Sequence, residues 1–252
     1  MALSLSACDF TPKINKEILR AQGFVGKRQY TEAVALYEKL LFRGLNNEMR
    51  IKVFYQLGEL YSIYLNNGRK AVSYFEKVVQ LSDDPLWSVK AKERIGEISL
   101  NFTKDYGKSA EAYAKLKNFY PKLEKADFYE FNYAMSVFNM DDLEAAQKNF
   151  QKLADNLNHK YHHKAIYYLG LIEYRYKHWD KAIAYWKEYI KQIDRKEDAA
   201  QVTFLIANAF ETMEELKPAY DLYFSILNEY PNPEVIRNRL NSIYNRRLGR
   251  KR

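Results

Sequence analysis

Small residues recur at a nearly constant interval along this sequence, and this periodicity constrains the fold more than any other feature. Each lies in the middle of a helical pattern, all but the first directly follow an apolar residue, and successive members lie 37, 38, 38, 36 and 37 residues apart: Ala21, Gly58, Gly96, Ala134, Gly170 and Ala207. A second small residue follows each of them after 12 to 14 positions: Ala33, Ala71, Ala110, Ala146, Ala182 and Ala219. A period of this length indicates a chain built from repeated supersecondary units.

Paired small residues have a simple role in helical packing. Two antiparallel helices approach to about 8–10 Å only where bulky side chains are absent. Large aromatic side chains then fill the space around the crossing, and the chain has 22 Tyr and 14 Phe to do so. One helix pair cannot bury its own apolar face, so pairs stack in series. No strand pattern competes, and we therefore expect an all-α fold of about six helix pairs.

The residues around these positions resemble the tetratricopeptide repeat (TPR). In the second unit the matching residues are Phe54, Leu57, Gly58 and Tyr61 on the first helix and Ala71, Phe75 and Val78 on the second. The third unit departs most, with Ser99 where Tyr is usual and Ala114 where an aromatic is usual. The resemblance covers residues 14–232 and implies a right-handed superhelical α-solenoid. Its implied function is that of a non-enzymatic scaffold for protein–protein interaction.

The two ends of the chain differ from the repeats. Residues 1–13 are expected to form a tether, with an unstructured stretch from Asp9 to Lys13. Residues 233–252 are expected to form a capping helix and a basic tail, with Pro233 in the first turn and apolar residues at helical spacing. Six pairs and this capping helix predict thirteen helices.

Most of the net charge lies in that last segment. The formal charge is +8, and the stretch from Arg237 to Arg252 holds seven basic residues and no acid, so the remaining 236 residues carry only +1. A solubilising helix end is the interpretation that we favour. Contact with anionic lipid or an acidic partner is the alternative. A nucleic-acid partner is not expected, because the charge does not form a patch beside a recognisable module.

The single cysteine lies in a short motif of its own. Leu5, Ser6, Ala7 and Cys8 resemble the lipobox of bacterial lipoproteins, whose cysteine is lipidated. A complete signal also needs charged and apolar regions that seven residues cannot hold, so we expect the natural start to lie upstream. The resemblance implies lipidation at Cys8, and Asp9 resembles a signal for retention at the inner membrane, although the choice of membrane stays open. The alternative is an ordinary N-terminus with a chance cysteine.

No motif in the sequence indicates catalysis. Nucleophile-elbow, phosphate-loop, dinucleotide-binding and zinc-protease motifs are absent, so we expect no enzymatic activity, cofactor or small-molecule substrate. One cysteine excludes an intrachain disulfide framework and a cysteine-based zinc site. His159, His162 and His163 are spaced to share a helix face. We interpret them as a solvated helix start rather than a metal site.

The resemblance also implies a binding groove on the first helices of the pairs. In the family, the groove is lined by positions three before, one after and four after the small residue. We predict that ten residues line or flank it: Tyr55, Phe131, Met135, Phe138, Lys164, Tyr167, Tyr174, Arg175, Phe204 and Asn208. Such a surface suits an extended or helical peptide with aromatic anchors. Phe204 replaces the lysine of the chaperone-binding members, so we expect no binding to an acidic chaperone tail.

Together these observations predict a membrane-anchored TPR lipoprotein of a bacterial envelope assembly, secretion or pilus machine. It would face the periplasm and hold a protein or peptide segment of that envelope complex, with the membrane reached through the lipid anchor. The alternative is a soluble cytoplasmic TPR adaptor without lipid. A catalytic role is not indicated, because no segment departs from the repeat.

Overall fold

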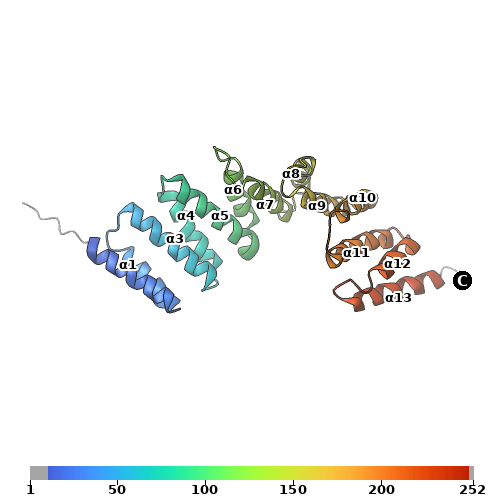
Figure 1. The fold of residues 1–252 in the computed structure, drawn as a ribbon, viewed down its shortest axis with the longest axis horizontal. Coiled ribbons are helices and arrows are strands. Elements are labelled where there is room, and N and C mark those ends of the chain that lie inside the picture. Colours follow the sequence, from blue (N-terminus) through green and yellow to red (C-terminus); the bar gives the residue numbers. More distant parts are fainter. Residues whose placement is uncertain (1–10, 250–252) are drawn as a thin grey trace, which may run out of the picture. The chain divides into compact units, whose positions relative to one another are not determined.

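The structure is a computed structural model that describes residues 11–249. These residues form thirteen α-helices and one short π-helical segment, with no strand among them (Figure 1). The first helices of the six pairs are α1 (Thr11–Gly26), α3 (Asn47–Ile63), α5 (Pro85–Ile98), α7 (Ala126–Asn139), α9 (His162–Arg175) and α11 (Lys196–Thr212). The second helices are α2 (Tyr30–Leu40), α4 (Gly68–Leu81), α6 (Tyr106–Lys117), α8 (Leu143–Asp155), α10 (Trp179–Ile190) and α12 (Leu216–Ser225). The all-α architecture of helix pairs predicted from the periodicity is thus confirmed, and α13 (Pro233–Gly249) follows the last pair.

The first helix begins earlier than expected. The stretch from Asp9 to Lys13 was expected to be unstructured, but α1 already begins at Thr11. Pro12 suits this position, because the first turn of a helix does not need its missing N–H. The expectation was therefore wrong from residue 11 onward, and Asp9 lies outside the described residues.

Small residues and aromatic rings pack against each other inside the pairs. A Cβ atom built on Gly58 would lie 2.7 Å from the tip of the Phe75 ring. The same atom on Gly96 would lie 2.8 Å from the Tyr113 ring, and on Gly170 it would lie 2.4 Å from Nε1 of Trp186. Ordinary contacts begin at 3.4 Å. Each glycine is therefore required because the ring of the second helix occupies the place of its side chain.

The third pair has its second small residue one position earlier than predicted. Ser109, and not Ala110, is fully buried. The aromatic residue that follows Ser109 by four positions is Tyr113, which takes the place assigned to Ala114. The Ser109 hydroxyl lies 3.1 Å from the carbonyl oxygen of Gly96, to which it donates, and 2.8 Å from Oγ of Ser136. A serine can occupy this tight position because its hydroxyl finds buried partners there.

The turns between the two helices of the pairs share one backbone feature. Six non-glycine residues in these turns have positive φ, between 48° and 68°: Arg28, Asn66, Lys104, Asp141, Lys177 and Glu214. Each directly precedes the N-cap of the second helix, and each lies five residues before its buried small residue. Left-handed residues of this kind end helices by satisfying their last carbonyl groups. For example, the N–H of His178 donates to the carbonyl oxygen of Glu173 at 2.9 Å.

The extra residue of the third pair is absorbed before this turn. The residues Ser99–Thr103 form the π-helical segment η1, which continues α5. A π-helical turn inserts one residue without breaking the helix. The distance along the chain from the turn to the second helix therefore stays constant, although the first helix varies in length.

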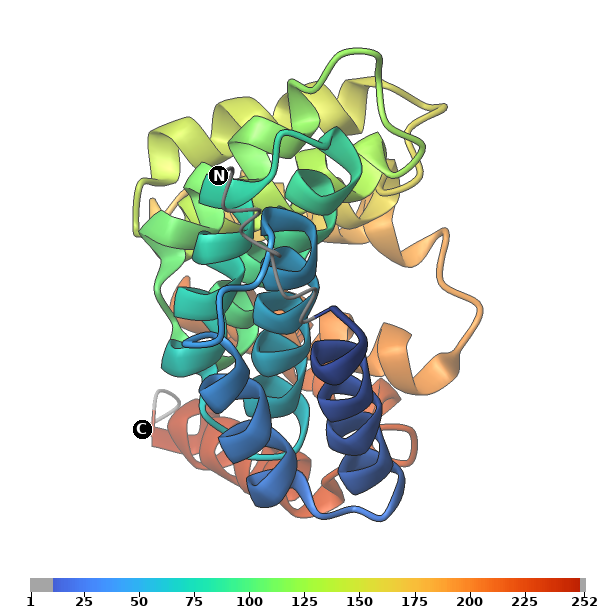
Figure 2. The same cartoon turned by 90° about the vertical axis from the view of Figure 1, so that its left-hand side faces the viewer.

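The chain divides into two compact units, Met1–Ser136 and Val137–Arg252. Within the first unit, the described helices from α1 to α6 follow one another side by side (Figures 1 and 2). Within each unit, polar side chains join positions about one repeat apart. Tyr129 donates to Glu93 and Lys108 to Glu76 in the first unit, and Tyr185 donates to Gln151 in the second. Neighbouring repeats are thus held by matched polar contacts as well as by apolar packing.

The last helix packs as the capping helix that the sequence predicted. Ile236, Leu240 and Ile243 are buried in an apolar cluster with residues of α11 and α12. Tyr244, which follows Ile243 directly, is 56% exposed and does not belong to this cluster. Part of the basic charge also serves this packing, since Arg246 donates to Glu211 at 2.9 Å and to Glu214 at 2.6 Å.

Candidate peptide-binding surface

Two of the predicted groove residues line one pocket in the second unit. Tyr167 of α9 and Phe204 of α11 lie in the wall of a pocket of about 380 Å³. Tyr189 of α10, Gln201 and Leu205 of α11, and Tyr230 complete most of its lining. Each of the two predicted residues lies three positions before its small residue, so the family offset selected two residues that line the same pocket. Their joint occurrence in a concave site is typical of ligand pockets, which are lined mainly by apolar and aromatic side chains.

The aromatic rings of this pocket are held by their neighbours. The Tyr167 and Tyr189 rings lie 5.3 Å apart between centroids. The Phe204 ring is stacked on Tyr230 at 5.0 Å and meets the edge of Tyr223 at 5.4 Å. Burial raises the pKa of Tyr167, with a smaller contribution from Tyr189. The Tyr167 hydroxyl therefore keeps its proton at neutral pH and can donate a hydrogen bond.

Two other predicted residues use their polar atoms inside the protein. The Tyr174 hydroxyl donates to Oδ1 of Asn208 at 2.5 Å, which joins α9 to α11. The Tyr174 ring packs on Trp179 and Trp186, with centroids 4.7 and 5.6 Å away. These contacts hold the repeats together, so neither polar group is available to a peptide without breaking them.

The remaining predicted residues of the second unit lie away from that pocket. Arg175 is paired with Asp141, and its guanidinium lies 5.7 Å from the centroid of the Phe138 ring. Phe138 meets the edge of Tyr168 at 5.5 Å. Lys164 is exposed, with Nζ 5.7 Å from the ring centroid of Tyr161.

The predicted residues of the first unit are half-buried. Tyr55 meets the edges of Phe75 and Trp87, with centroids 5.2 and 5.3 Å away. Phe131 and Met135 lie on α7, and Met135 packs against the apolar cluster around Tyr113. Tyr55 and Met135 therefore take part in packing between helices.

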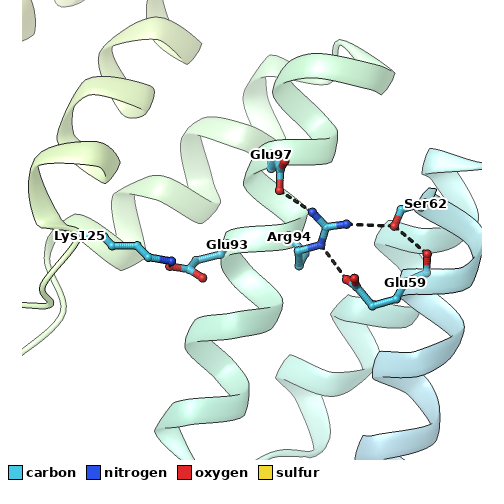
Figure 3. A network of polar contacts seen from close by, with 6 residues as sticks. All are labelled: Glu59, Ser62, Glu93, Arg94, Glu97 and Lys125. Atoms are coloured by element: carbon cyan, nitrogen blue, oxygen red, sulfur yellow. Dashed lines mark hydrogen bonds and ion pairs between the residues drawn. The ribbon is translucent and has the colours of Figure 1, made fainter. Parts of the chain in front are cut away.

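A charged network occupies the groove position after Gly58. Glu59 accepts a hydrogen bond from Nε of Arg94 at 2.7 Å, and Arg94 also donates to Glu97 at 2.5 Å and to Ser62 at 3.1 Å (Figure 3). Lys125 pairs with Glu93 at 3.2 Å in the same view (Figure 3). Burial alone would lower the pKa of Arg94, but the two carboxylates outweigh it and raise the pKa. The guanidinium is therefore charged, and it fixes α5 on α3.

A second pocket, which was not predicted from the sequence, lies in the first unit. It has a volume of about 410 Å³ and is lined by Ile18 and Gln22 of α1, Tyr37 of α2 and Val53 and Gln56 of α3, among others. Ile18 lies three positions before Ala21, the offset that identified Tyr167 and Phe204, and Gln22 lies one position after it, the offset that identified Met135 and Asn208. Applying those offsets to the first pair would have found it.

The predictions for the other candidate residues have different outcomes. Cys8 lies outside the described residues, so its lipidation stays a prediction. The expected solvated helix start is wrong for His159, which is 4% exposed, and its Nδ1 accepts the N–H of Tyr161 at 3.1 Å. Within residues 11–249 there is no group of three metal-ligating side chains. None of the helices in that range combines the length and apolar character needed to cross a bilayer.

Several solved structures share this architecture. PilW, a widely conserved type IV pilus biogenesis factor, matches with a TM-score of 0.56 and 15% identity over 92% of this chain and 98% of its own. YrrB, a TPR protein with an unusual peptide-binding site, matches with a TM-score of 0.52 and 13% identity over 74% of this chain and 89% of its own. A chain in the structure of Naa15/Naa10 bound to HypK-THB matches with a TM-score of 0.62 and 15% identity over 92% of this chain. The match spans only 34% of the length of that longer chain. No family model and no curated protein sequence matches the chain. The chain therefore has the fold of tetratricopeptide-repeat proteins, an all-α solenoid of stacked helix pairs.

Proposed function

We propose that this chain is a non-enzymatic scaffold that holds a segment of a partner protein in the pocket of Tyr167 and Phe204. The observation that carries this proposal is the joint presence of these two aromatic residues in one concave site. They come from adjacent repeats and lie 37 residues apart in the sequence. The structure of YrrB, with its peptide-binding site, and that of a Rap regulator in complex with the Phr* peptide support binding of a peptide segment on this fold.

The chemistry of the pocket favours an apolar anchor in the partner. Its aromatic residues offer large, rigid contact area, which is the usual source of binding energy at such sites. Gln201 is exposed at the pocket and can hydrogen-bond to a peptide backbone. Asp198 also lines the pocket and lies 3.8 Å from Arg195, so its charge is partly balanced. A segment with an aromatic or aliphatic side chain flanked by polar residues fits these groups best.

We further propose that the scaffold is lipidated at Cys8 and faces the periplasm of a bacterium as part of an envelope assembly, secretion or pilus machine. The lipobox-like residues from Leu5 to Cys8 support the anchor. The similarity to PilW, which spans nearly the full length of both chains, supports the envelope role. A cytoplasmic adaptor without lipid is the outcome that would replace this part of the proposal.

Partner binding is tested with a pocket variant that removes no packing. Gln201→Arg places a long cationic side chain at the pocket, whereas Gln192→Arg makes the same change at an exposed residue that does not line it. Partners recovered from native membranes by the unsubstituted chain are expected to be lost with Gln201→Arg and kept with Gln192→Arg. The double variant Tyr167→Ala and Phe204→Ala should also lose them. Recovery that is unchanged in both pocket variants would place the binding site elsewhere.

Lipidation is tested separately in the native host. A radiolabelled fatty acid is expected to enter the unsubstituted chain and not a Cys8→Ser variant, and the variant should leave the membrane fraction. A chain that carries no acyl group and stays soluble in its host would rule out the anchor without affecting the pocket.

A further inference from the structure

The second and third helix pairs can be compared residue by residue. Gly58 and Gly96, the small residues of their first helices, lie 38 positions apart, and so do Ala71 and Ser109 of their second helices. The residues of α3 and α4 therefore have equivalents 38 positions later, in α5, η1 and α6. Differences between such equivalents show what one pair contains and the other lacks.

Two tyrosines of the second pair meet at one carboxylate of the first pair. The hydroxyls of Tyr61 and Tyr74 donate to Oε1 of Glu38 at 2.9 and 2.8 Å. Nζ of Lys70 lies 3.6 Å from the same oxygen. The Tyr74 ring packs on Phe54, with centroids 6.0 Å apart, and is buried. The ring and the hydroxyl of Tyr74 together thus reach from α4 to α2.

The third pair keeps the equivalent ion pair and loses both tyrosines. The ion pair is formed by Glu76 and Lys108, which are bonded to each other between α4 and α6. The two tyrosines are replaced by Ser99 and Ala112. Within residues 11–249, Lys108 is the only side chain that donates to Glu76, whose side chain is 39% exposed. A carboxylate accepts several hydrogen bonds, so Glu76 can take a further one from outside the chain.

Two pockets lie where the two rings are missing. One, of about 260 Å³, is lined by Ala112, and the other, of about 280 Å³, is lined by Ser99. Both have Glu76 and Lys108 in their walls, so they meet at one carboxylate as the two tyrosines of the second pair do. An engineered cavity of about 150 Å³ holds benzene, so the Ala112 pocket has room for a phenol ring.

The wall of the Ala112 pocket combines apolar and cationic side chains. Val79 and Ile95 form its apolar part, and Lys92 and Lys115 bring two ammonium groups. Apolar side chains favour the body of an aromatic ring, and cations favour its face. The lining therefore suits a ring better than an aliphatic side chain.

The second pair shows the same kind of contact inside the chain. Lys77 is the equivalent of Lys115, and its Nζ lies 4.8 Å from the centroid of the Tyr74 ring. A ring in the Ala112 pocket would meet the equivalent cation, and its hydroxyl would meet the equivalent carboxylate. The neighbouring repeat thus indicates which side chain the pocket fits.

We propose that the Ala112 pocket binds a tyrosine side chain of a partner protein, whose hydroxyl donates to Glu76 as that of Tyr74 donates to Glu38. This inference rests on the proposed scaffold function and adds a second recognition surface, which lies between the second helices α4 and α6. Phenylalanine would fill the same space and leave the hydrogen bond unmade. Aspartate or glutamate would bring a second negative charge to Glu76 and is disfavoured.

The test uses a displayed library of end-blocked ten-residue peptides, selected on the full chain and counter-selected on Ala112→Tyr. This variant places the missing ring inside the chain and should block the pocket. Peptides that bind the unsubstituted chain but not Ala112→Tyr are expected to share one tyrosine. Replacing that tyrosine of the peptide with phenylalanine should lower the affinity about five- to tenfold, the range for one lost hydrogen bond.

A double-mutant cycle identifies the acceptor of this hydrogen bond. Glu76→Gln should weaken the tyrosine peptide and leave the affinity of the phenylalanine peptide unchanged, because only the first donates to the carboxylate. Glu111→Gln is the matched control, since it makes the same change at another acidic residue of the lining, which pairs with Lys115 at 2.6 Å. It should affect both peptides equally. Equal losses for both peptides with Glu76→Gln would overturn the assignment.

The free protein provides a second readout. In Ala112→Tyr the new ring fills the pocket and its hydroxyl can donate to Glu76, so the midpoint of thermal unfolding is expected to rise by about 2–4 °C. Tyr74→Ala is the converse variant in the second pair, and its midpoint should fall because it empties the same place and removes a bond to Glu38. A lower midpoint for Ala112→Tyr would show that the space does not accept a ring and would overturn the inference.

The variants also separate this inference from the proposed function. Peptides that are lost with Gln201→Arg but kept with Ala112→Tyr belong to the pocket of Tyr167 and Phe204. A selection that yields only such peptides, or one in which the peptides lost with Ala112→Tyr share no tyrosine, would overturn the Ala112 site and leave the scaffold function in place.

Discussion

Replacing Gly170 with alanine tests the packing rule on which the fold depends. The added Cβ would lie 2.4 Å from Nε1 and 2.6 Å from Cδ1 of Trp186. This is about 1 Å closer than ordinary contact, which begins at 3.4 Å. Trp186 is fully buried, so its ring has no free space to enter. The ring must shift, and the hydrogen bond from its Nε1 to the carbonyl oxygen of Tyr167 must lengthen or break.

The expected magnitude follows from three contributions. Adding a methyl group to a closely packed core costs about 1–3 kcal/mol. Loss of the Trp186 hydrogen bond costs a further 0.5–1.5 kcal/mol or so. Alanine is a better helix former than glycine, which returns about 1 kcal/mol. The free energy of unfolding of Gly170→Ala should therefore be lower by about 1–3 kcal/mol.

The control is a glycine in a helix with no neighbour. A Cβ on Gly23 of α1 meets nothing within 4 Å, so Gly23→Ala should gain the helix propensity alone and raise the free energy of unfolding by about 0.5–1 kcal/mol. Urea unfolding followed by far-UV circular dichroism measures both variants. If Gly170→Ala were stabilised as much as Gly23→Ala, the aromatic ring would not require the glycine and the argument would be refuted.

Two further predictions concern the backbone turns and the response to acid. Lys177 is exposed, and its φ is 63°. Replacing it with glycine would relieve about 1–2 kcal/mol of left-handed strain in the folded state. This gain exceeds the cost of about 0.4–1 kcal/mol that comes from the larger conformational entropy of glycine in the unfolded chain. Lys177→Gly should therefore stabilise the chain in urea unfolding, whereas Lys181→Gly, inside α10, should destabilise it by about 1 kcal/mol. Burial would raise the pKa of Glu38, but hydrogen bonds from Tyr74 and Tyr61 and the charge of Lys70 outweigh it and lower the pKa below its ordinary 4.5. The stabilisation by the Glu38 carboxylate is complete above about pH 4.5 and is lost as the pH falls through the lowered pKa. In Glu38→Gln, the free energy of unfolding should therefore decline less steeply below that pH when it is measured across an acid titration. A slope equal to that of the unsubstituted chain would contradict this.

The sequence predicted the architecture well because its main signal is local and repeated. Small residues at intervals of 36 to 38 positions are visible without any knowledge of the fold, and six occurrences confirm one another. Tyr167 and Phe204 each lie three positions before one of these small residues, and the structure places both in the wall of one pocket. The error at Ser109 arose because only alanine was considered as the second small residue.

Other features had no signal in the sequence. Four of the six left-handed turn residues are Arg, Lys or Glu, which do not favour positive φ by themselves, so the tertiary structure imposes it. Tyr174 and Asn208 lie at groove offsets, yet they bond to each other, and only the distance between them shows this.

The constant spacing from the left-handed turn residue to the small residue of the second helix limits how these repeats can change in length. One residue added between Lys177 and Ala182 would rotate the rest of α10 by about 100°, and Trp186 would leave Gly170. One residue added upstream can instead be taken up as a π-helical turn, as in η1. Insertions in a library made from this chain should therefore survive in the first helices and in the loops between repeats, and be eliminated from these five-residue segments.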